Sequence, residues 1–408
     1  MATPTGSGQV RNIHAIPGVR LGSVAAGIRY RDRDDLLVLA LPEGATTAAT
    51  FTRNAFCAAP VTVAREHLAS AAPRYLLVNS GNANAGTGAR GLGDARASCE
   101  ALARLADCAP EQVLPFSTGV IGEYLPMERL VSHLPLAMSA LREDGWEAAS
   151  RAIMTTDTVA KVAMQRFVVD GREATLIGIA KGAGMIRPDM ATMLAFLATD
   201  ATVCAEALQG CLRAAVDQSF NCISIDGDTS TNDACVLSAA GTLGNAPITA
   251  MDDPSVAALS AAVDGVCSEL ATAIVRDGEG ATKLVSVEVN GAGTRAEARA
   301  VADTIAHSPL VKTALFAGDP NWGRILAAIG RAGVAQLDIN RVSIALDDCL
   351  IVSAGGRDPS YEECAGRRVM EQGSFSIRVA MGRGEAQARV LTCDLSYDYV
   401  RINAEYRS

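Results

Sequence analysis

The 408-residue chain has few aromatic side chains, few histidines and a deficit of basic charge. Aromatic residues make up 4% of it and hydrophobic residues 49%, so its core must consist mainly of Ala, Val, Leu and Ile. The formal net charge of −9 argues against broad binding to nucleic-acid phosphates, which requires clustered Lys and Arg. The chain is also longer than a single core usually grows, so two packed subdomains are expected. This composition favours a soluble enzyme of small metabolites.

Histidine is too scarce to support the commonest metal and nucleophile sites. The four histidines are His14, His67, His133 and His307, and none stands at metal-ligand spacing from another or from a cysteine. The chain has neither a GxSxG nucleophile elbow nor a P-loop. We therefore expect no metal site and no serine–histidine–aspartate triad. If the chain is an enzyme, its general base is expected to be a group other than histidine.

No segment indicates export or insertion into a membrane. The eleven cysteines are an odd number scattered from Cys57 to Cys393 without a CxxC pair, which is typical of buried, reduced thiols in the cytosol. The N-terminus lacks an apolar core of signal-peptide length. The apolar run that starts at Met193 is interrupted by Asp200, so it is too short to span a bilayer. We expect a cytoplasmic protein.

Short β-like runs alternate with alanine-rich helical stretches along the chain. Bounded apolar runs rich in β-branched residues predict strands at 35–41, 74–80, 174–180 and 341–346. Apolar residues at helical spacing predict helices at 66–73, 95–107, 205–218 and 253–275. This alternation predicts an α/β or α+β protein in which helices cover sheets.

Glycine-rich loops punctuate the chain, and two of them partly match known binding motifs. Gly86–Gly91 is a literal GxGxxG, but other residues separate it from its strand, which disfavours dinucleotide binding. Asp226–Asp233 begins like a calcium loop, but it has Thr231 where glycine is needed and Leu237 where the bidentate glutamate belongs. A tight turn is the better interpretation of that loop.

The segment 181–201 offers a nucleophile that needs no histidine. A predicted strand runs into a glycine turn, Pro188 stiffens the chain, and a second apolar strand begins near Thr192. A threonine at the start of a strand is ordinarily only a β-former. If the peptide bond before Thr192 is cleaved, however, its new α-amine, with a pKa of about 8, serves as a general base for its own hydroxyl.

This segment resembles the self-cleavage site of the ornithine acetyltransferase family, which is also called the bifunctional glutamate N-acetyltransferase or ArgJ family. The resemblance extends over essentially the whole chain through motifs in the family's order. These are NSGNANA at 79–85, STGVIGE at 117–123, MTTDT at 154–158, SFNCISIDGDTSTND at 219–233, DGEGATK at 277–283, GDPNWGRI at 318–325 and the ending YVRINAEYRS. Ser408 stands where many members have threonine, which keeps a hydroxyl group.

The resemblance implies a self-cleaving enzyme. The precursor is expected to break between Ala191 and Thr192, giving an α-chain of 1–191 and a β-chain of 192–408. Thr192 would first attack the Ala191 carbonyl, and water would open the resulting ester. The same hydroxyl would then take acetyl from N-acetylornithine and pass it to glutamate.

The resemblance also implies a site and an assembly. The oxyanion donors correspond to Thr118 and Gly119. Substrate contacts correspond to Thr155, Lys181, Thr192, Glu279, Asn403 and Ser408. No cofactor is expected, and use of acetyl-CoA as a further donor is left open. The implied fold is that of ornithine acetyltransferase and aminopeptidase DmpA, with sheets sandwiched between helix layers, and the cleaved chains are expected to form an α2β2 heterotetramer.

Other interpretations of the same residues stay open. STG at 117–119 is equally typical of a strand-to-helix turn with a capping hydroxyl. Lys181 and Glu279 are equally typical of surface charges. Since chain ends usually fray, Asn403 and Ser408 contact substrate only if the tail is tied into the site. Two other functions fit a similar pocket: a self-cleaving aminopeptidase, in which water accepts the acyl group, and an uncut, non-catalytic amino-acid-binding protein.

Overall fold

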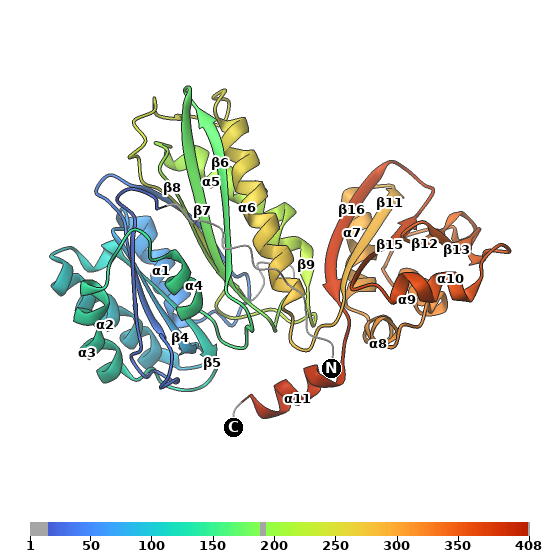
Figure 1. Cartoon of the computed structure of the whole chain (residues 1–408), viewed down its shortest axis with the longest axis horizontal. Helices are drawn as coiled ribbons and strands as arrows, with labels where there is room; N and C mark the ends of the chain where they lie inside the picture. The colour runs from blue at the N-terminus through green and yellow to red at the C-terminus, as the bar shows by residue number, and fades with distance from the viewer. Residues whose placement is uncertain (1–14, 188–192, 407–408) are drawn as a thin grey trace.

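The chain folds into two lobes of different size (Figure 1). The structure is a computed structural model that describes residues 15–187 and 193–406. The larger lobe contains a four-stranded and a five-stranded sheet, and the smaller lobe is built on a seven-stranded sheet. Helices pack on the sheets in both lobes, so the predicted α/β class is confirmed.

The four-stranded sheet of the larger lobe has the order β1-β2-β4-β5. Its strands are β1 (Arg20–Val24), β2 (Leu36–Ala40), β4 (Tyr75–Asn82) and β5 (Val113–Val120). Three helices cover its outer face, namely α1 (Ala59–Ser70), α2 (Gly88–Ala106) and α3 (Met127–Ser139), and η1 (Pro110–Gln112) leads into β5. The parallel pairing of β4 with β5 brings the ends of both strands to one edge of the sheet, beside the site described below.

The five-stranded sheet has the order β3-β10-β8-β7-β6. Its strands are β3 (Thr46–Phe51), β10 (Ala234–Ala239), β8 (Leu194–Thr199), β7 (Arg172–Lys181) and β6 (Lys161–Val169). Helices α5 (Ala205–Gln218) and α6 (Val256–Arg276) cover its outer face. Its inner face packs against the four-stranded sheet together with α4 (Trp146–Ala152). The larger lobe is therefore a helix–sheet–sheet–helix sandwich.

Side-chain alternation in β8 shows why the two sheets stack. Leu194 and Phe196 face the other sheet, while Ala195 and Leu197 face the helices. All six residues of β8 are buried because both faces are covered, as for a strand inside a layered core. The rings of Phe116 on β5 and Phe196 on β8 meet edge to face across the interface, with centroids 5.1 Å apart.

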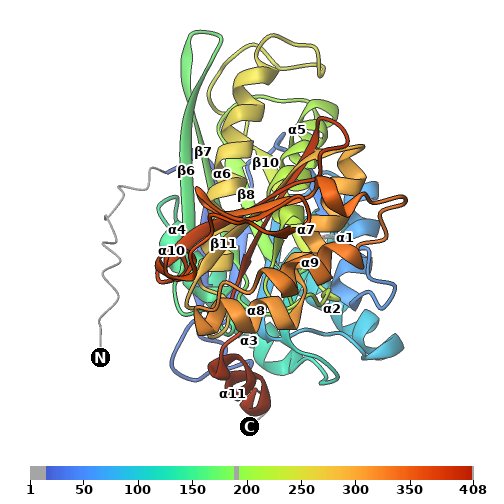
Figure 2. The same ribbon diagram turned by 90° about the vertical axis from the view of Figure 1, so that its right-hand side faces the viewer.

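The smaller lobe has one sheet with a single hydrophobic core. Its strand order is β14-β13-β12-β15-β11-β16-β9. The strands are β14 (Gly356–Arg357), β13 (Cys349–Ser353), β12 (Ser343–Leu346), β15 (Ser374–Ala380), β11 (Leu284–Ala292), β16 (Ala386–Cys393) and β9 (Ile223–Ser224). The helices are α7 (Arg295–Ala306), α8 (Pro309–Ala317), α9 (Trp322–Gly330) and α10 (Glu363–Met370), with η3 (Ile339–Arg341) as a short turn. The turn η2 (Phe220–Cys222) packs in the core of the larger lobe and leads from α5 into β9. Figure 2 looks onto this lobe.

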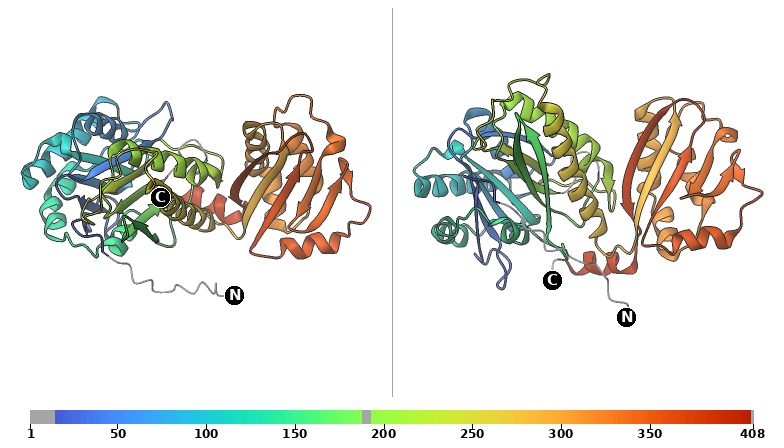
Figure 3. Two further views of the ribbon diagram at one scale, coloured as in Figure 1. Left: turned by 90° about the horizontal axis from the view of Figure 1, so that it is seen from above. Right: turned by 45° about the horizontal axis from the view of Figure 1, so that its top comes forward.

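The chain passes between the lobes several times, and strand β9 and helix α11 are two of the connecting segments. Strand β9 follows helix α5 of the larger lobe and pairs in parallel with β16. Helix α11 (Tyr397–Glu405) leaves the smaller lobe and runs back beneath the larger one (Figure 3). The C-terminal segment thereby reaches the same end of the molecule as the carboxyl ends of β5 and β7.

The predicted division at 191/192 lies between neighbouring strands and does not coincide with the separation of the lobes. Strands β7 and β8, on either side of it, are antiparallel partners with Lys181 opposite Leu194. Ala191 and Thr192 themselves lie outside the described residues. By length and composition alone α6 is long and apolar enough to cross a membrane, but it packs on β6 and β7 as a core helix.

Candidate active site

A cavity of about 210 Å³ opens where β5, β7 and α11 converge. It is lined by Thr118, Gly119, Val120, Ile121, Thr155, Thr156, Lys181, Gly184, Met185, Ser230, Thr231, Asn232, Glu279, Asn403 and Tyr406. Every predicted oxyanion or substrate residue that the structure describes lies on this wall. Ser408, like Thr192, falls outside the described residues.

Thr118 and Gly119 lie at the end of strand β5. Gly119 has a φ of +136°, and a Cβ there would lie 2.2 Å from the carbonyl carbon of Gly81 on β4. Only glycine therefore permits this close approach of the two strands. The hydroxyl of Ser117 donates to Asn79 Oδ1 at 2.6 Å and fixes the same strand end. Since STG lies within a strand, its interpretation as a helix-capping turn is wrong.

Lys181 ends strand β7 and points into the cavity wall. It is only 4% exposed, so its interpretation as a surface charge is wrong. Its Nζ donates to Thr118 Oγ1 at 3.1 Å, which joins β7 to β5. Burial lowers the pKa of Lys181, and nearby Asp157 opposes that shift. The ammonium faces a hydroxyl and open cavity, an arrangement that leaves it available to an anionic ligand.

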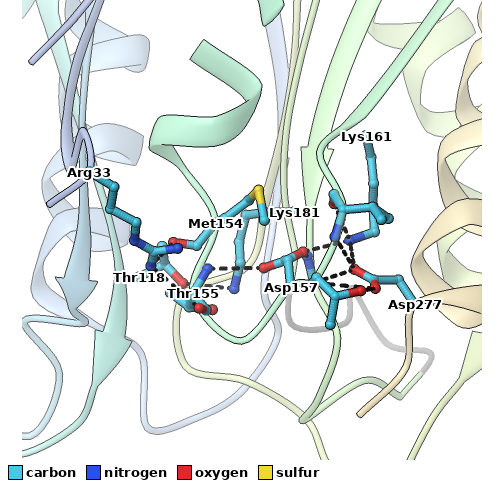
Figure 4. Close-up of polar contacts among 11 residues, drawn as sticks. Arg33, Thr118, Met154, Thr155, Asp157, Lys161, Lys181 and Asp277 are labelled. Atoms are coloured by element: carbon cyan, nitrogen blue, oxygen red, sulfur yellow. Dashed lines mark hydrogen bonds and ion pairs between the residues drawn. The ribbon is translucent and has the colours of Figure 1, made fainter. Parts of the chain in front are cut away.

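Asp157 lies behind Lys181 and holds two parts of the wall (Figure 4). Its carboxylate accepts hydrogen bonds from the amides of Thr155 at 3.0 Å and Gly182 at 2.7 Å. Burial would raise the pKa of Asp157, but Lys181 and Lys161 outweigh it and lower the pKa to about 2. This acid is therefore a fixed negative charge at neutral pH.

The loop that carries Thr155 is also held from the other side. Arg33 Nη2 donates to the carbonyl oxygens of Met154 at 2.9 Å and Thr155 at 3.3 Å. Figure 4 shows the Arg33 side chain reaching this loop opposite Asp157. Thr155 is thus anchored through its own amide and carbonyl, and its side chain is presented at the cavity wall.

Glu279 and Asn403 bring the C-terminal helix to the cavity. Asn403 Nδ2 on α11 donates to Glu279 Oε2 at 2.7 Å. Gly184 makes room for that carboxylate, because a Cβ there would lie 2.5 Å from its carboxyl carbon. Tyr406, next to the end of α11, also lines the cavity, and burial raises its pKa to about 12. The chain end up to Tyr406 is therefore tied to the site, as substrate contact by Asn403 requires.

Asp233 directly precedes strand β10 and lies beside the start of strand β8. Its Oδ1 accepts the amide of Met193 at 2.8 Å, one residue after the predicted nucleophile. Asp233 is 1% exposed, and burial raises its pKa well above the usual range. The nearby hydroxyls of Thr52 and Ser230 act to lower the pKa of Asp233. Among residues 15–187 and 193–406, however, no group donates a hydrogen bond to Asp233 Oδ2.

Several of these supporting residues were not singled out from the sequence. Asp157 and Asp233 stand inside the motifs MTTDT and SFNCISIDGDTSTND. Asp277, which accepts the amide of Thr158 at 3.1 Å, stands inside DGEGATK, so the motifs contained a signal. Asn232, in the last of these, donates to the carbonyl oxygens of Ala83 and Ser117 and supports the wall from behind. Lys161 stands in none of the motifs.

The two loops that partly match binding motifs have structural roles. Helix α2 starts at Gly88, within the GxGxxG segment, six residues after β4 ends. Asp226 accepts the amides of Met185 at 2.5 Å and Ile186 at 2.9 Å, so its loop is a turn that braces the cavity segment. Over residues 15–187 and 193–406, no group of three or more His, Cys, Asp or Glu side chains is placed to hold a metal ion.

The cysteines are free thiols, as predicted, but not all are buried. Cys99, Cys211, Cys235, Cys267 and Cys393 are buried, Cys364 is exposed, and the others are intermediate. The expectation of uniformly buried thiols is wrong because most of the remaining cysteines lie at the ends of elements, where packing is incomplete.

Comparison with known proteins identifies the relatives of the chain. The sequence profile of the ArgJ family matches residues 20–408. The chain belongs to the ArgJ family. It is 62% identical over 393 residues to the arginine biosynthesis bifunctional protein ArgJ of Methylococcus capsulatus, and the match covers 96% of both chains. The family predicted from the ordered motifs is confirmed.

Two solved structures are among the similar proteins. The arginine biosynthesis bifunctional protein ArgJ of Bacillus halodurans is 40% identical, and the match covers 50% of this chain and 95% of that one with a TM-score of 0.48. The ornithine acetyltransferase of Mycobacterium tuberculosis, complexed with ornithine, is 32% identical, with 43% and 94% covered and a TM-score of 0.35.

Proposed function

We propose that this ArgJ-family chain transfers acetyl from N-acetylornithine to glutamate in arginine biosynthesis, with Thr192 as the acyl-carrying nucleophile. The observation that carries the proposal is the convergence of Thr118, Gly119, Thr155, Lys181, Glu279 and Asn403 on one cavity. The name of the Methylococcus capsulatus relative, which is 62% identical, supports the pathway.

The proposed reaction begins with self-cleavage. The Thr192 hydroxyl attacks the Ala191 carbonyl, the peptide nitrogen leaves as the Thr192 amine, and water hydrolyses the ester that joins the two segments. Asp233 holds the amide of Met193, which follows Thr192, and so fixes the chain on the β8 side of the scissile bond. Because β7 and β8 are hydrogen-bonded neighbours, the chains 1–191 and 192–408 would stay in one fold.

Acetyl transfer then proceeds in two half-reactions. The Thr192 amine takes the hydroxyl proton while the oxygen attacks the acetyl carbonyl of N-acetylornithine. Thr118 and Gly119 stabilise the resulting oxyanion, and the intermediate collapses to acyl-threonine as ornithine leaves with the proton. The amine of glutamate attacks this ester by the reverse sequence, which releases N-acetylglutamate and restores the hydroxyl.

The charges of the cavity suit amino-acid substrates. Both substrates carry an α-carboxylate, for which the buried ammonium of Lys181 is the proposed partner. Glu279 is the proposed partner of the ammonium of ornithine, and Asn403 orients that carboxylate. Thr155 and Ser408 complete the proposed substrate contacts, with Ser408 beyond the described residues.

The wider setting is also part of the proposal. The enzyme is cytoplasmic, needs no cofactor, and assembles as an α2β2 heterotetramer of the two cleaved chains. Size-exclusion chromatography with light scattering tests the assembly. Acetyl transfer from acetyl-CoA to glutamate, measured without N-acetylornithine, tests whether the enzyme is bifunctional.

The decisive experiment follows product formation with and without glutamate. The purified protein should convert N-acetylornithine to ornithine rapidly only when glutamate is present, with equal amounts of N-acetylglutamate formed. Thr192→Ala should be uncut and inactive, Thr192→Ser should process slowly, and Thr313→Ala on the exposed surface of α8 should behave as wild type. Equal turnover without glutamate would indicate an aminopeptidase instead. An uncut wild-type protein that only binds N-acetylornithine would indicate a binding protein.

A further inference from the structure

A buried ion triad lies behind the cavity and takes no part in the proposed reaction. Lys161 Nζ donates to Asp157 Oδ1 at 2.7 Å and to Asp277 Oδ2 at 2.6 Å. The three side chains are at most 4% exposed. Figure 4 shows Asp157 between Lys181 on one side and Lys161 with Asp277 on the other.

Each acid of the triad holds a segment that carries a proposed substrate contact. Asp157 accepts the amides of Thr155 and of Gly182, the neighbour of Lys181. Asp277 accepts both the amide and the hydroxyl of Thr158, and it precedes Glu279 by two residues. Lys161 pairs with both acids. The segments around Thr155, Gly182 and Asp277, which are distant in the sequence, are therefore held together around one ammonium group.

Such a triad stabilises a protein interior less efficiently than apolar packing does. Burying charges costs free energy that their mutual attraction only partly returns, and apolar replacements of similar volume are often equally stable. Its position behind a cavity therefore points to a role in the geometry of the cavity more than in stability. The charges also balance only when Lys181 is included, because two acids then face two lysines. The triad and the cavity lysine thus form one electrostatic unit.

We propose that Asp157 is a positioning residue which, with Lys161 and Asp277, sets the spacing of Thr155, Lys181 and Glu279 and so controls substrate binding. This inference rests on the proposed function, since those three residues are its substrate contacts. The triad touches neither the reacting atoms nor the cavity surface. Its loss should therefore raise KM for both amino-acid substrates more than it lowers kcat.

A second consequence concerns pH. Lys181 faces the carboxyl groups of Asp157, Asp233 and Glu279 and the ammonium of Lys161. Removing the charge of Asp157 should lower the pKa of Lys181, because burial then acts with one fewer opposing charge. If Lys181 binds carboxylates as ammonium, the alkaline limb of kcat/KM should move to lower pH.

The test compares Asp157→Asn with a matched control. Asparagine keeps the volume and an acceptor oxygen but loses the charge. Glu173→Gln removes an exposed carboxylate from the hairpin of β6 and β7, which begins at Lys161 and ends at Lys181, and there Glu173 pairs with Arg166 at 2.9 Å. For Asp157→Asn we expect KM for N-acetylornithine to rise about tenfold or more, a smaller change in kcat, and the alkaline limb to shift to lower pH. Glu173→Gln should match wild type in all three.

A second variant covers a failure of Asp157→Asn to fold. Lys161→Gln/Asp277→Asn removes one charge of each sign and should also raise KM. Wild-type KM and pH dependence in folded variants would overturn the inference, as would a loss of kcat and stability with KM unchanged. If neither variant folds, the triad is needed for stability, and that result would also overturn the inference. An active Thr192→Ala protein in the same assay would instead overturn the proposed function.

Discussion

Gly184→Ala perturbs one contact of the cavity and little else. The added Cβ would lie 2.5 Å from the carboxyl carbon and Oε2 of Glu279 and 2.6 Å from its Oε1. Gly184 does not have a left-handed φ, so alanine fits its backbone. The obstructing atoms are the end of a flexible side chain. The carboxylate should therefore retreat by about 1 Å to reach ordinary van der Waals contact while the backbone stays in place.

This displacement should cost activity and spare stability. The retreat removes the 2.7 Å hydrogen bond that Asn403 donates to Glu279. A misplacement of about 1 Å at a substrate contact costs up to about 100-fold in rate, so we expect kcat/KM to fall by about 10- to 100-fold. The free energy of unfolding should change by less than about 1 kcal/mol, since no buried side chain is lost.

Steady-state kinetics and urea unfolding test both parts. Gly93→Ala is the control, because Gly93 is exposed in helix α2 with open space where the added methyl group would lie, and it should keep full activity. Gly184→Ala/Glu279→Asp should recover part of the activity, because the shorter side chain clears the new methyl group. Unchanged kcat/KM in Gly184→Ala would refute the role given to Glu279. Loss of activity that merely follows loss of folded protein would refute the reasoning about Gly184.

Two further predictions concern the fold. Phe196→Ala should lower the free energy of unfolding by about 3–5 kcal/mol, measured by urea denaturation, because it empties the interface with Phe116 between the two sheets. A loss below about 1 kcal/mol would contradict the sandwich packing. His307 has its pKa lowered to about 4 by burial and by nearby cations such as Arg187 and Lys312. The unfolded chain therefore binds the proton more readily, and up to about 3 kcal/mol of stability should be lost as pH falls from about 6.5 to 4. His307→Gln should make the free energy of unfolding less dependent on pH between about 6.5 and 4. An unchanged pH dependence would show that His307 is not the group responsible.

Each strand and helix predicted from a local pattern overlaps an observed element, because the periodicity of these segments reflects their burial. The helix predicted at 205–218 has those bounds as α5, and the strands predicted at 35–41 and 341–346 contain β2 and β12. Helix starts were less accurate. Helix α1 begins at Ala59, before the predicted residue 66, and the proline in its first turn is the start signal that the apolar spacing alone does not reveal. Helix α2 begins at Gly88 because tertiary packing overrides the low helix propensity of three glycines in its first two turns.

The site also contains residues that the sequence predicted and contacts that it did not predict. The cavity residues were named from motifs, each of which is contiguous in the sequence. The supporting contacts join segments that no local pattern relates: Lys161 and Asp277 are 116 residues apart, and Met193 and Asp233 are 40 apart. Such pairs depend on how the strands and loops are arranged, and one sequence contains no direct record of that arrangement. The stacked sheets of the larger lobe were likewise expected only from the family resemblance, which implied sheets sandwiched between helix layers, and not from any local pattern.

Scission before Thr192 is the claim on which the proposed chemistry depends most directly. The measurement is the intact mass of fully active, purified protein, taken before and after incubation with N-acetylornithine in the absence of glutamate. We predict two chains, 1–191 and 192–408, with one acetyl group gained by the second chain and lost again when glutamate is added. An unbroken chain of 408 residues with full transferase activity would contradict the account.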